Sequence, residues 1–275
     1  MAGYIVILIT GLVIVAVAAK KILRIKRRKA LRLRPFPDDW RQMLEEKVTL
    51  YRSLPEQLKT ELHGLIHVFL DEKTFIGCRD QEITDLIKLT IAAQACMLVL
   101  NRPVKIYPRL STIYIYPKTY VVDVKHHEGD LIIEGKDVRV GESWHNGPVV
   151  LAWDSITQTA HSIHQGHNVV LHEFAHQLDQ EDGAMNGAPL LDNSSAYKSW
   201  AGVFQEEYEK LCDAVQYHQY TILDDYGTTD PAEFFAVATE AFFEKPALLH
   251  QYNPQLYEEL QKYYKLDPAS WESLI

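Results

Sequence analysis

The residues most able to do chemistry lie in NVVLHEFAHQLDQ, residues 168–180. His172 and His176 are four apart, so on a helix they project from one face, one turn from each other. Two imidazole nitrogens at that spacing can reach one Zn²⁺ at about 2.0–2.1 Å. Glu173 would lie about 100° around the helix, where a carboxylate can take a proton from zinc-activated water. The pattern predicts a hydrolytic zinc site, and the alternative is an amphipathic helix with histidines on a polar face.

A catalytic zinc usually has three protein ligands and one open position. The segment 226–244 offers Glu233 and Glu240, which are seven apart and share a helix face. Glu233 also completes a capping box with Asp230, so it could serve the start of a helix instead. Asp179, three residues past the second histidine, is predicted to orient a histidine or to end its helix. Spacing alone does not choose between the two glutamates.

Three other histidines precede this segment without any metal-binding pattern. They are His161, His164 and His167, and we expect them to be loop or capping residues. The three cysteines are far apart and form no CxxC pair. This spacing argues against a disulfide scaffold or a thiolate metal site and suits a reducing compartment.

The amino-terminal segment predicts a membrane anchor. Residues 2–19 carry no charge, and a helix of this length spans about 27 Å, just enough to cross a hydrocarbon core. Nine of the 28 basic residues and no acid fall within residues 1–34. Because the positive charge follows the apolar run, the positive-inside rule places everything after Lys20 in the cytoplasm. We therefore expect a single-pass membrane protein with a cytoplasmic catalytic domain.

Three regions follow from these patterns: a transmembrane anchor at 1–24, a basic juxtamembrane linker at 25–37 that would lie on anionic lipid, and a domain at 38–275. Beyond residue 34 the chain has 19 basic against 37 acidic residues, a net charge of −18. A body this acidic is a poor nucleic-acid binder, so no nucleic-acid partner is expected.

The domain is predicted to be α+β, mainly helical with a small β-sheet, behind the transmembrane helix. Residues 103–153 are rich in β-branched and aromatic residues punctuated by glycine and proline, which is typical of strands. Helical periodicity occupies 38–54, 55–72, 82–100, 168–180, 194–217, 230–244 and 253–264. The helix at 82–100 is apolar on most faces, so we expect it to be buried.

Several segments together resemble the Mlc titration factor A family of bacterial zinc metallopeptidases. They are VVLHEFAHQLD, DDYGTTDPAEFFAVATEAFF, IYPKTYVVD and GESWHNGPVVLAWD, and the similarity covers roughly residues 40–265. The resemblance implies a zincin-like fold, similar to the catalytic domain of anthrax lethal factor. It also implies one zinc ion per chain.

The resemblance assigns roles to particular residues and favours Glu233 over Glu240 as the third ligand. The implied zinc ligands are His172, His176 and Glu233, with Glu173 as catalytic base and Tyr226 as transition-state stabiliser.

Two features depart from the family. Its best-known members lack an amino-terminal anchor. Members can also carry an additional histidine near the metal from the sheet region, whereas GDLIIEGKDV contains none and Glu134 is its nearest polar residue.

The expected function is a membrane-anchored, zinc-dependent and gluzincin-like peptidase, aminopeptidase-like or a short-peptide hydrolase, with a peptide as substrate. The alternative is a zinc-containing binding protein that sequesters a transcriptional regulator without proteolysis. A glutamate beside the first histidine serves no purpose in a structural site, and structural zinc usually recruits cysteines. Both observations favour the enzyme.

Overall fold

The structure is a computed structural model that describes residues 2–102, 106–128, 131–139, 141–143, 147–161 and 167–271. The helices of the first half are α1 (Ala2–Arg32), α2 (Asp38–Lys47), α3 (Thr49–Ser53), α4 (Glu56–Glu72) and α5 (Asp85–Met97). The strands are β1 (Thr74–Gly77), β2 (Thr112–Tyr116), β3 (Tyr120–Glu128), β4 (Leu131–Arg139), β5 (Gly141–Ser143) and β6 (Val149–Ala152). The later helices are α6 (Trp153–His161), α7 (Val169–Asp179), α8 (Ser194–Gln216), α9 (Pro231–Glu244), α10 (Pro246–Tyr252) and α11 (Pro254–Tyr264). Short 3-10 turns are η1 (Gln180–Asp182), η2 (Asp225–Thr228) and η3 (Pro268–Ser270).

The main sheet has the order β1-β2-β6-β5. Strands β1, β2 and β6 run parallel, and only the edge strand β5 is antiparallel. The connection from β1 to β2 contains α5, since parallel neighbours need a crossover. The predicted α+β class is therefore corrected to a mostly helical chain with a small, largely parallel sheet. Strand β6 is buried along its whole length, and α7 packs beside β5 and β6.

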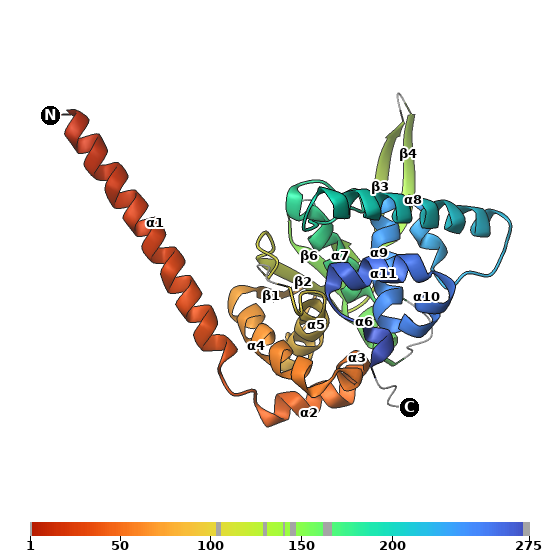
Figure 1. Cartoon of the computed structure of the whole chain (residues 1–275), viewed down its shortest axis with the longest axis horizontal. Coiled ribbons are helices and arrows are strands. Elements are labelled where there is room, and N and C mark those ends of the chain that lie inside the picture. Colours follow the sequence, from red (N-terminus) through yellow and green to blue (C-terminus); the bar gives the residue numbers. More distant parts are fainter. Residues whose placement is uncertain are drawn as a thin grey trace.

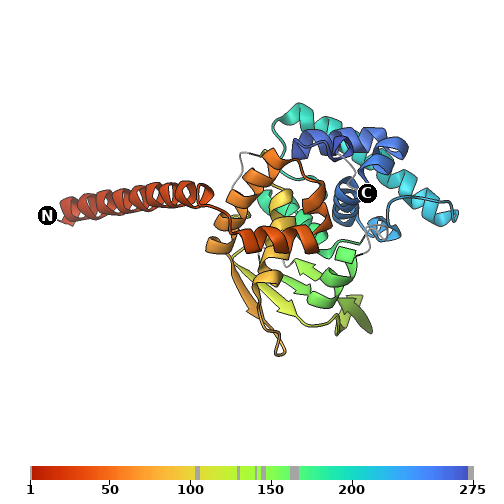
Figure 2. The same cartoon turned by 90° about the horizontal axis from the view of Figure 1, so that it is seen from below.

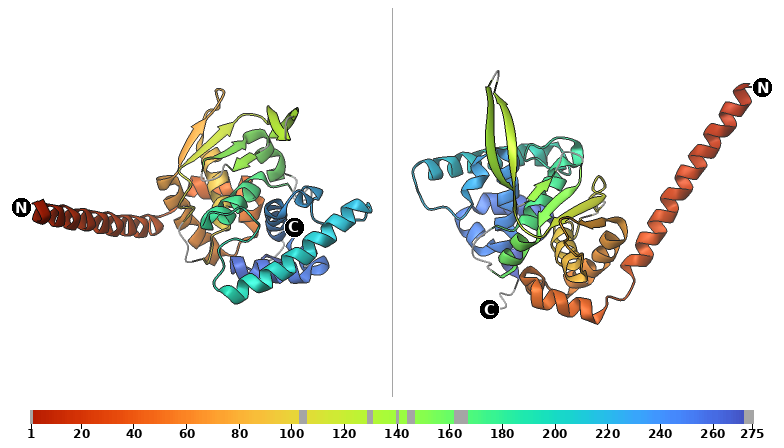
Figure 3. Two further views of the ribbon diagram at one scale, coloured as in Figure 1. Left: turned by 90° about the horizontal axis from the view of Figure 1, so that it is seen from above. Right: turned by 180° about the vertical axis from the view of Figure 1, so that it is seen from behind.

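Strands β3 and β4 form a separate antiparallel hairpin that projects from the body (Figure 1; Figure 3, right). Its register runs from Tyr120 opposite Arg139 to Glu128 opposite Leu131. Glu134 occupies the position in β4 opposite Lys125.

The core lies where α4, α5, α7 and α9 meet the sheet and each other. Every residue of α5 from Leu89 to Met97 is buried, which confirms the prediction of a helix apolar on most faces. Phe174 of α7 packs edge-on against Tyr107, with ring centroids 4.8 Å apart. Helix α7 therefore enters the middle of the core, so its polar side chains have little freedom to move.

Helix α1 extends away from the body over most of its length and meets it only near its carboxyl end (Figure 2). There Arg28 lies 2.6 Å from Glu72 of α4, and Arg24 lies 3.1 Å from the same carboxylate. Arg27 pairs with Asp71, the neighbouring acid. Burial opposes ionisation of Glu72, but the hydrogen bonds from Arg28 and Arg24 outweigh it and lower its pKa to about 2.

Within the described part of the chain, no helix combines the length and the apolar character that crossing a membrane requires. The predicted transmembrane helix and single-pass membrane location are therefore wrong, and the predicted association with a membrane is not supported. The apolar run 2–19 is not a helix of its own. It continues without a break into eight basic residues between Lys20 and Arg32, and that half of the helix is held against α4. The boundary drawn after residue 24 falls inside α1, and the three-part division stays a prediction.

A buried aromatic cluster attaches the joint between α1 and α2 to α4. The ring of Phe36 stacks on His63 with centroids 3.9 Å apart. Tyr51 of α3 and His63 Nε2 share a hydrogen bond of 2.7 Å. Burial lowers the pKa of His63 to about 4, so the imidazole is neutral at pH 7.

This cluster predicts an acid-sensitive contribution to stability. Because the folded-state pKa of His63 lies below the unfolded value of about 6.5, the contribution is complete above pH 6.5 and is lost as pH falls toward 4. In urea titrations at pH 7.5 and 5, His63→Gln should lose about 1–2 kcal/mol less unfolding free energy on acidification than the native protein. His218→Asn, an exposed control, should show the native loss. An equal loss in His63→Gln would contradict the assignment.

Candidate metal centre

Asn168 starts the helix that carries both motif histidines. Its side-chain Oδ1 accepts a hydrogen bond from Leu171 N at 3.1 Å, which is an N-cap. Its Nδ2 donates to Gln94 of α5 at 2.6 Å and to Glu244 of α9 at 3.0 Å. One buried side chain therefore sets the start of α7 relative to two other helices.

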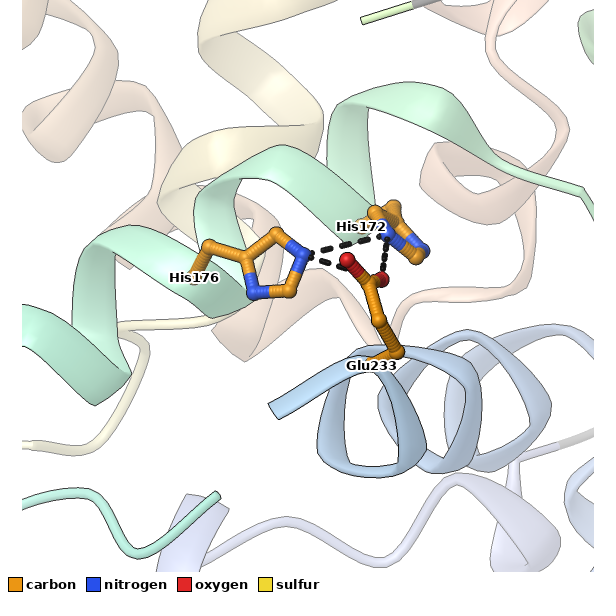
Figure 4. Close-up of side chains that lie close together, drawn as sticks. All are labelled: His172, His176 and Glu233. Carbon is orange, nitrogen blue, oxygen red and sulfur yellow. Dashed lines mark hydrogen bonds and ion pairs between the residues drawn. The ribbon is translucent and has the colours of Figure 1, made fainter. Parts of the chain in front are cut away.

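Glu233 stands in the first turn of α9. Asp230 caps this helix through bonds to the amides of Ala232 and Glu233, at 2.8 and 3.0 Å, and Pro231 occupies the first helical position. The carboxylate of Glu233 is turned toward the two histidines of α7 (Figure 4). The backbone of Glu233 thus takes part in capping, while its side chain contributes to the cluster.

Three ligand-type atoms converge between α7 and α9 (Figure 4). Glu233 Oε2 lies 2.8 Å from His172 Nε2 and 3.3 Å from His176 Nε2, and the two Nε2 atoms are 3.1 Å apart. Ligands about 2.0–2.1 Å from a tetrahedral zinc would be roughly 3.3 Å from one another. The observed spacing is close to that value, and two nitrogens and one oxygen form a donor set that zinc accepts. The residues therefore fit the metal.

Glu240 lies behind His172 and outside this convergence. Its Oε1 is 2.7 Å from His172 Nδ1, and its Oε2 accepts from Asn168 N at 2.5 Å. When His172 Nδ1–H donates to Glu240, the lone pair of Nε2 faces Glu233 and His176. Of the two glutamates that spacing could not separate, Glu233 joins the cluster and Glu240 orients one of its histidines.

The electrostatics of the cluster follow from this arrangement. Burial acts to lower the pKa of His172, but hydrogen bonds with Glu233 and Glu240 outweigh it and hold that pKa well above its usual value. Burial acts to raise the pKa of Glu233, and hydrogen bonds from His172 and His176 overcome it, lowering the pKa to about 2. The site therefore attracts positive charge, whether a proton or a cation.

The other residues singled out in the sequence take definite places. Glu173 is buried on α7, and its negative charge contributes to raising the pKa of His172. Tyr226 belongs to η2, is 52% exposed, and its ring centroid lies 5.9 Å from that of His172. Of the two roles predicted for Asp179, it does not bond to a histidine side chain, but it does end its helix, α7. Its carboxylate accepts a hydrogen bond from Gly187 N at 2.8 Å and so ties the following loop to α7.

Sequence reasoning missed the residues that support the site. Asn168 was recognisable as an N-cap by its position before the apolar run, but nothing in the sequence indicated its bonds to α5 and α9. His167, expected to be a loop residue, pairs with Asp224 at 2.9 Å. His161 ends α6, and His164 lies outside the described residues.

Comparison with known proteins identifies the class to which this fold and site belong. The sequence matches the family model described as glucose-regulated metallo-peptidase M90 over residues 22–265, so the chain belongs to this metallopeptidase family. It is similar to Mlc titration factor A of Pectobacterium atrosepticum, with 30% identity over 240 residues, covering 83% of this chain and 88% of the relative. The corresponding protein of Klebsiella pneumoniae is 32% identical over 233 residues, with 83% and 86% covered.

A further relative is the uncharacterized protein slr2042 of Synechocystis sp., which is 44% identical over 244 residues, covering 88% of this chain and 89% of its own length. These relatives confirm the resemblance to the Mlc titration factor A family. Membership in a metallopeptidase family also implies a bound metal.

The role of Asn168 gives a prediction about stability. Asn168→Ala removes an N-cap and two interhelical hydrogen bonds at a buried position, so it should cost about 2–4 kcal/mol. Asn193→Ala removes only the N-cap of α8, at an exposed position, and should cost about 0.5–2 kcal/mol. Urea titration of both variants measures the difference. Equal losses would show that the contacts of Asn168 to α5 and α9 contribute nothing.

Proposed function

We propose that this protein is a zinc-dependent peptidase, aminopeptidase-like or acting on short peptides, with one zinc ion per chain. The observation that carries the proposal is the convergence of His172 Nε2, His176 Nε2 and Glu233 Oε2 within 3.3 Å of one another. Membership in a metallopeptidase family supports it independently. The ligands would be those three residues, leaving a fourth position open for water or substrate.

Zinc bound there would supply Lewis-acid chemistry, lowering the pKa of a coordinated water toward about 7 and polarising the scissile carbonyl. Glu173 is the general base: it takes the proton of the attacking water and passes it to the leaving amine. Its burial beside His172 suits this role, since a water-poor setting strengthens its interaction with the proton that it accepts. Tyr226 donates a hydrogen bond to the oxyanion that develops on the substrate.

A second candidate function is binding of a protein regulator without proteolysis. The relatives named Mlc titration factor A favour it, since the name describes titration of another protein. The acidic body of this chain would suit a basic partner. Both functions could use the same metal, so hydrolysis is the property that separates them.

Hydrolysis of chromogenic amino-acid and short-peptide substrates tests the proposal. We expect one zinc per chain, hydrolysis that a chelator abolishes, and recovery when zinc is added back. Stoichiometric zinc with no hydrolysis of any substrate would favour the binding function instead.

Glu173→Gln separates metal binding from turnover. Because Glu173 acts on the proton and does not ligate, the variant should keep one zinc per chain and lose at least about 100-fold in kcat. Metal analysis and initial rates measure the two properties on the same preparation. Turnover at the native rate would show that Glu173 is not the base.

Glu240→Gln tests the orientation of His172. Losing the carboxylate that accepts from Nδ1 should weaken zinc affinity about 10–100-fold, as measured by competition with a chromophoric chelator. Glu244→Gln, one turn further along α9, keeps an acceptor for Asn168 and should bind zinc as tightly as the native protein. Native affinity in Glu240→Gln would mean that His172 needs no support from this residue.

A further inference from the structure

The start of the short turn η2, which carries Tyr226, is bonded to the carboxylate of Asp224. Asp224 precedes the turn, and its Oδ1 accepts a hydrogen bond from Tyr226 N at 2.9 Å. Its Oδ2 lies 2.9 Å from His167 Nε2. One oxygen of Asp224 therefore fixes the backbone of Tyr226, and the other bonds to His167, which directly precedes the N-cap of α7.

The opposite side of η2 is closed by packing against α8 and α9. A Cβ added to Gly227 would meet Leu211 of α8 at 3.1 Å and Val237 of α9 at 3.4 Å, so the turn sits directly against both helices. Tyr208 of α8 donates to Thr228 O at 2.9 Å. These contacts fix how far η2 can approach α9, and the bond to His167 fixes it relative to α7.

The contacts that hold Tyr226 and those that hold His172 both start from two adjacent residues, 167 and 168. The side chain of His167 bonds to Asp224, which accepts from the amide of Tyr226. The amide of Asn168 donates to Glu240, the carboxylate that also bonds His172. A displacement of residues 167–168 would therefore shift Tyr226 and His172 together.

We propose that Asp224 and His167 are positioning residues, which hold Tyr226 at its place beside His172 through the backbone cap and the pair between the two side chains. The inference rests on the proposed function, since it assigns these residues to the placement of a group that acts on substrate. Neither residue touches the metal ligands in the described contacts, and their effect passes through Tyr226.

The charges around the pair set its pH range. The hydrogen bond that His167 donates to Asp224 raises the pKa of His167, and the charge of Glu240 acts in the same direction. Burial and the charge of Lys245 act to lower it. The hydrogen bond from His167 lowers the pKa of Asp224, and Asp225 acts in the same direction. Glu244 also faces this region, and the charge of His167 acts to lower the pKa of that carboxyl. The ion pair is therefore complete below the ordinary histidine pKa of about 6.5 and is lost as pH rises through the raised pKa of His167.

The two contacts should differ in strength. The side chain of His167 is 62% exposed, so an ion pair there contributes little by itself. The cap to Tyr226 N is the stronger restraint. We expect Asp224→Ala, which removes both contacts, to have a larger effect than Asp224→Asn or His167→Gln, which remove the charge pair only.

Hydrogen exchange of the metal-free full-length protein tests the restraint without reference to activity. Asp224→Ala should speed exchange of the Tyr226 amide at least about 10-fold, while amides of α11 keep their native rates and report an intact fold. Asp213→Asn, an exposed acid of α8, is the control and should leave the Tyr226 amide unchanged. Native exchange at Tyr226 in Asp224→Ala would overturn the proposal.

Kinetics of the zinc-loaded protein test the consequence. Tyr226→Phe should lower kcat about 100-fold, and Asp224→Ala about 10–100-fold, both with native zinc content. If Asp224 acts through Tyr226, adding Asp224→Ala to Tyr226→Phe lowers kcat no further. If the two kcat losses multiplied in the double variant, the proposal would be overturned.

The pH dependence of kcat tests the part of His167. The ratio of native kcat to His167→Gln kcat should fall toward one as pH rises above 6.5. A ratio independent of pH would show that His167 does not help to position Tyr226.

A complete lack of hydrolysis in the native protein would refute the proposed function. The exchange result at Tyr226 would still decide whether Asp224 holds that residue, so the two failures are distinguishable.

Discussion

The site depends on one constraint: three polar side chains from two helices must share a point inside the molecule. His172 and His176 are fixed on α7, which the core surrounds, so the third group has to be brought to them. The first turn of α9 does this, because Asp230 and Pro231 set where the helix begins and therefore where Glu233 stands. Burying two imidazoles and a carboxylate costs free energy, which is offset by their mutual contacts, by the bond between His172 and Glu240, or by an ion between them.

A second layer of polar contacts keeps the two helices in register. Asn168 caps α7 and reaches both α5 and α9, while Glu240 joins the amide of Asn168 to the far nitrogen of His172. The neighbouring His167 extends the same support to the turn that carries Tyr226. A displacement at the start of α7 would therefore shift both His172 and the turn that carries Tyr226.

The sequence predicted what depends on local periodicity and missed what depends on tertiary contacts. The four-residue spacing was sufficient to predict that His172 and His176 project from one face of one helix. It could not rank Glu233 against Glu240, because residues seven apart lie two turns along one face, roughly 10 Å from each other. Both in fact contact His172, one at Nε2 and the other at Nδ1. The roles of His167 and Asp224 depend on chain segments far apart in sequence. The amino-terminal prediction failed because the apolar run and the basic residues after it were divided between an anchor and a linker, whereas they form one helix, α1, whose basic half contacts α4.

Diffraction from crystals grown with zinc, recorded on both sides of the zinc absorption edge, would show which side chains hold the metal. We predict a single strong anomalous peak about 2.0–2.2 Å from His172 Nε2, His176 Nε2 and a carboxylate oxygen of Glu233, with Glu240 remaining on His172 Nδ1. A site without anomalous signal, a peak coordinated by Glu240 in place of Glu233, or histidine rings turned away from each other would contradict it.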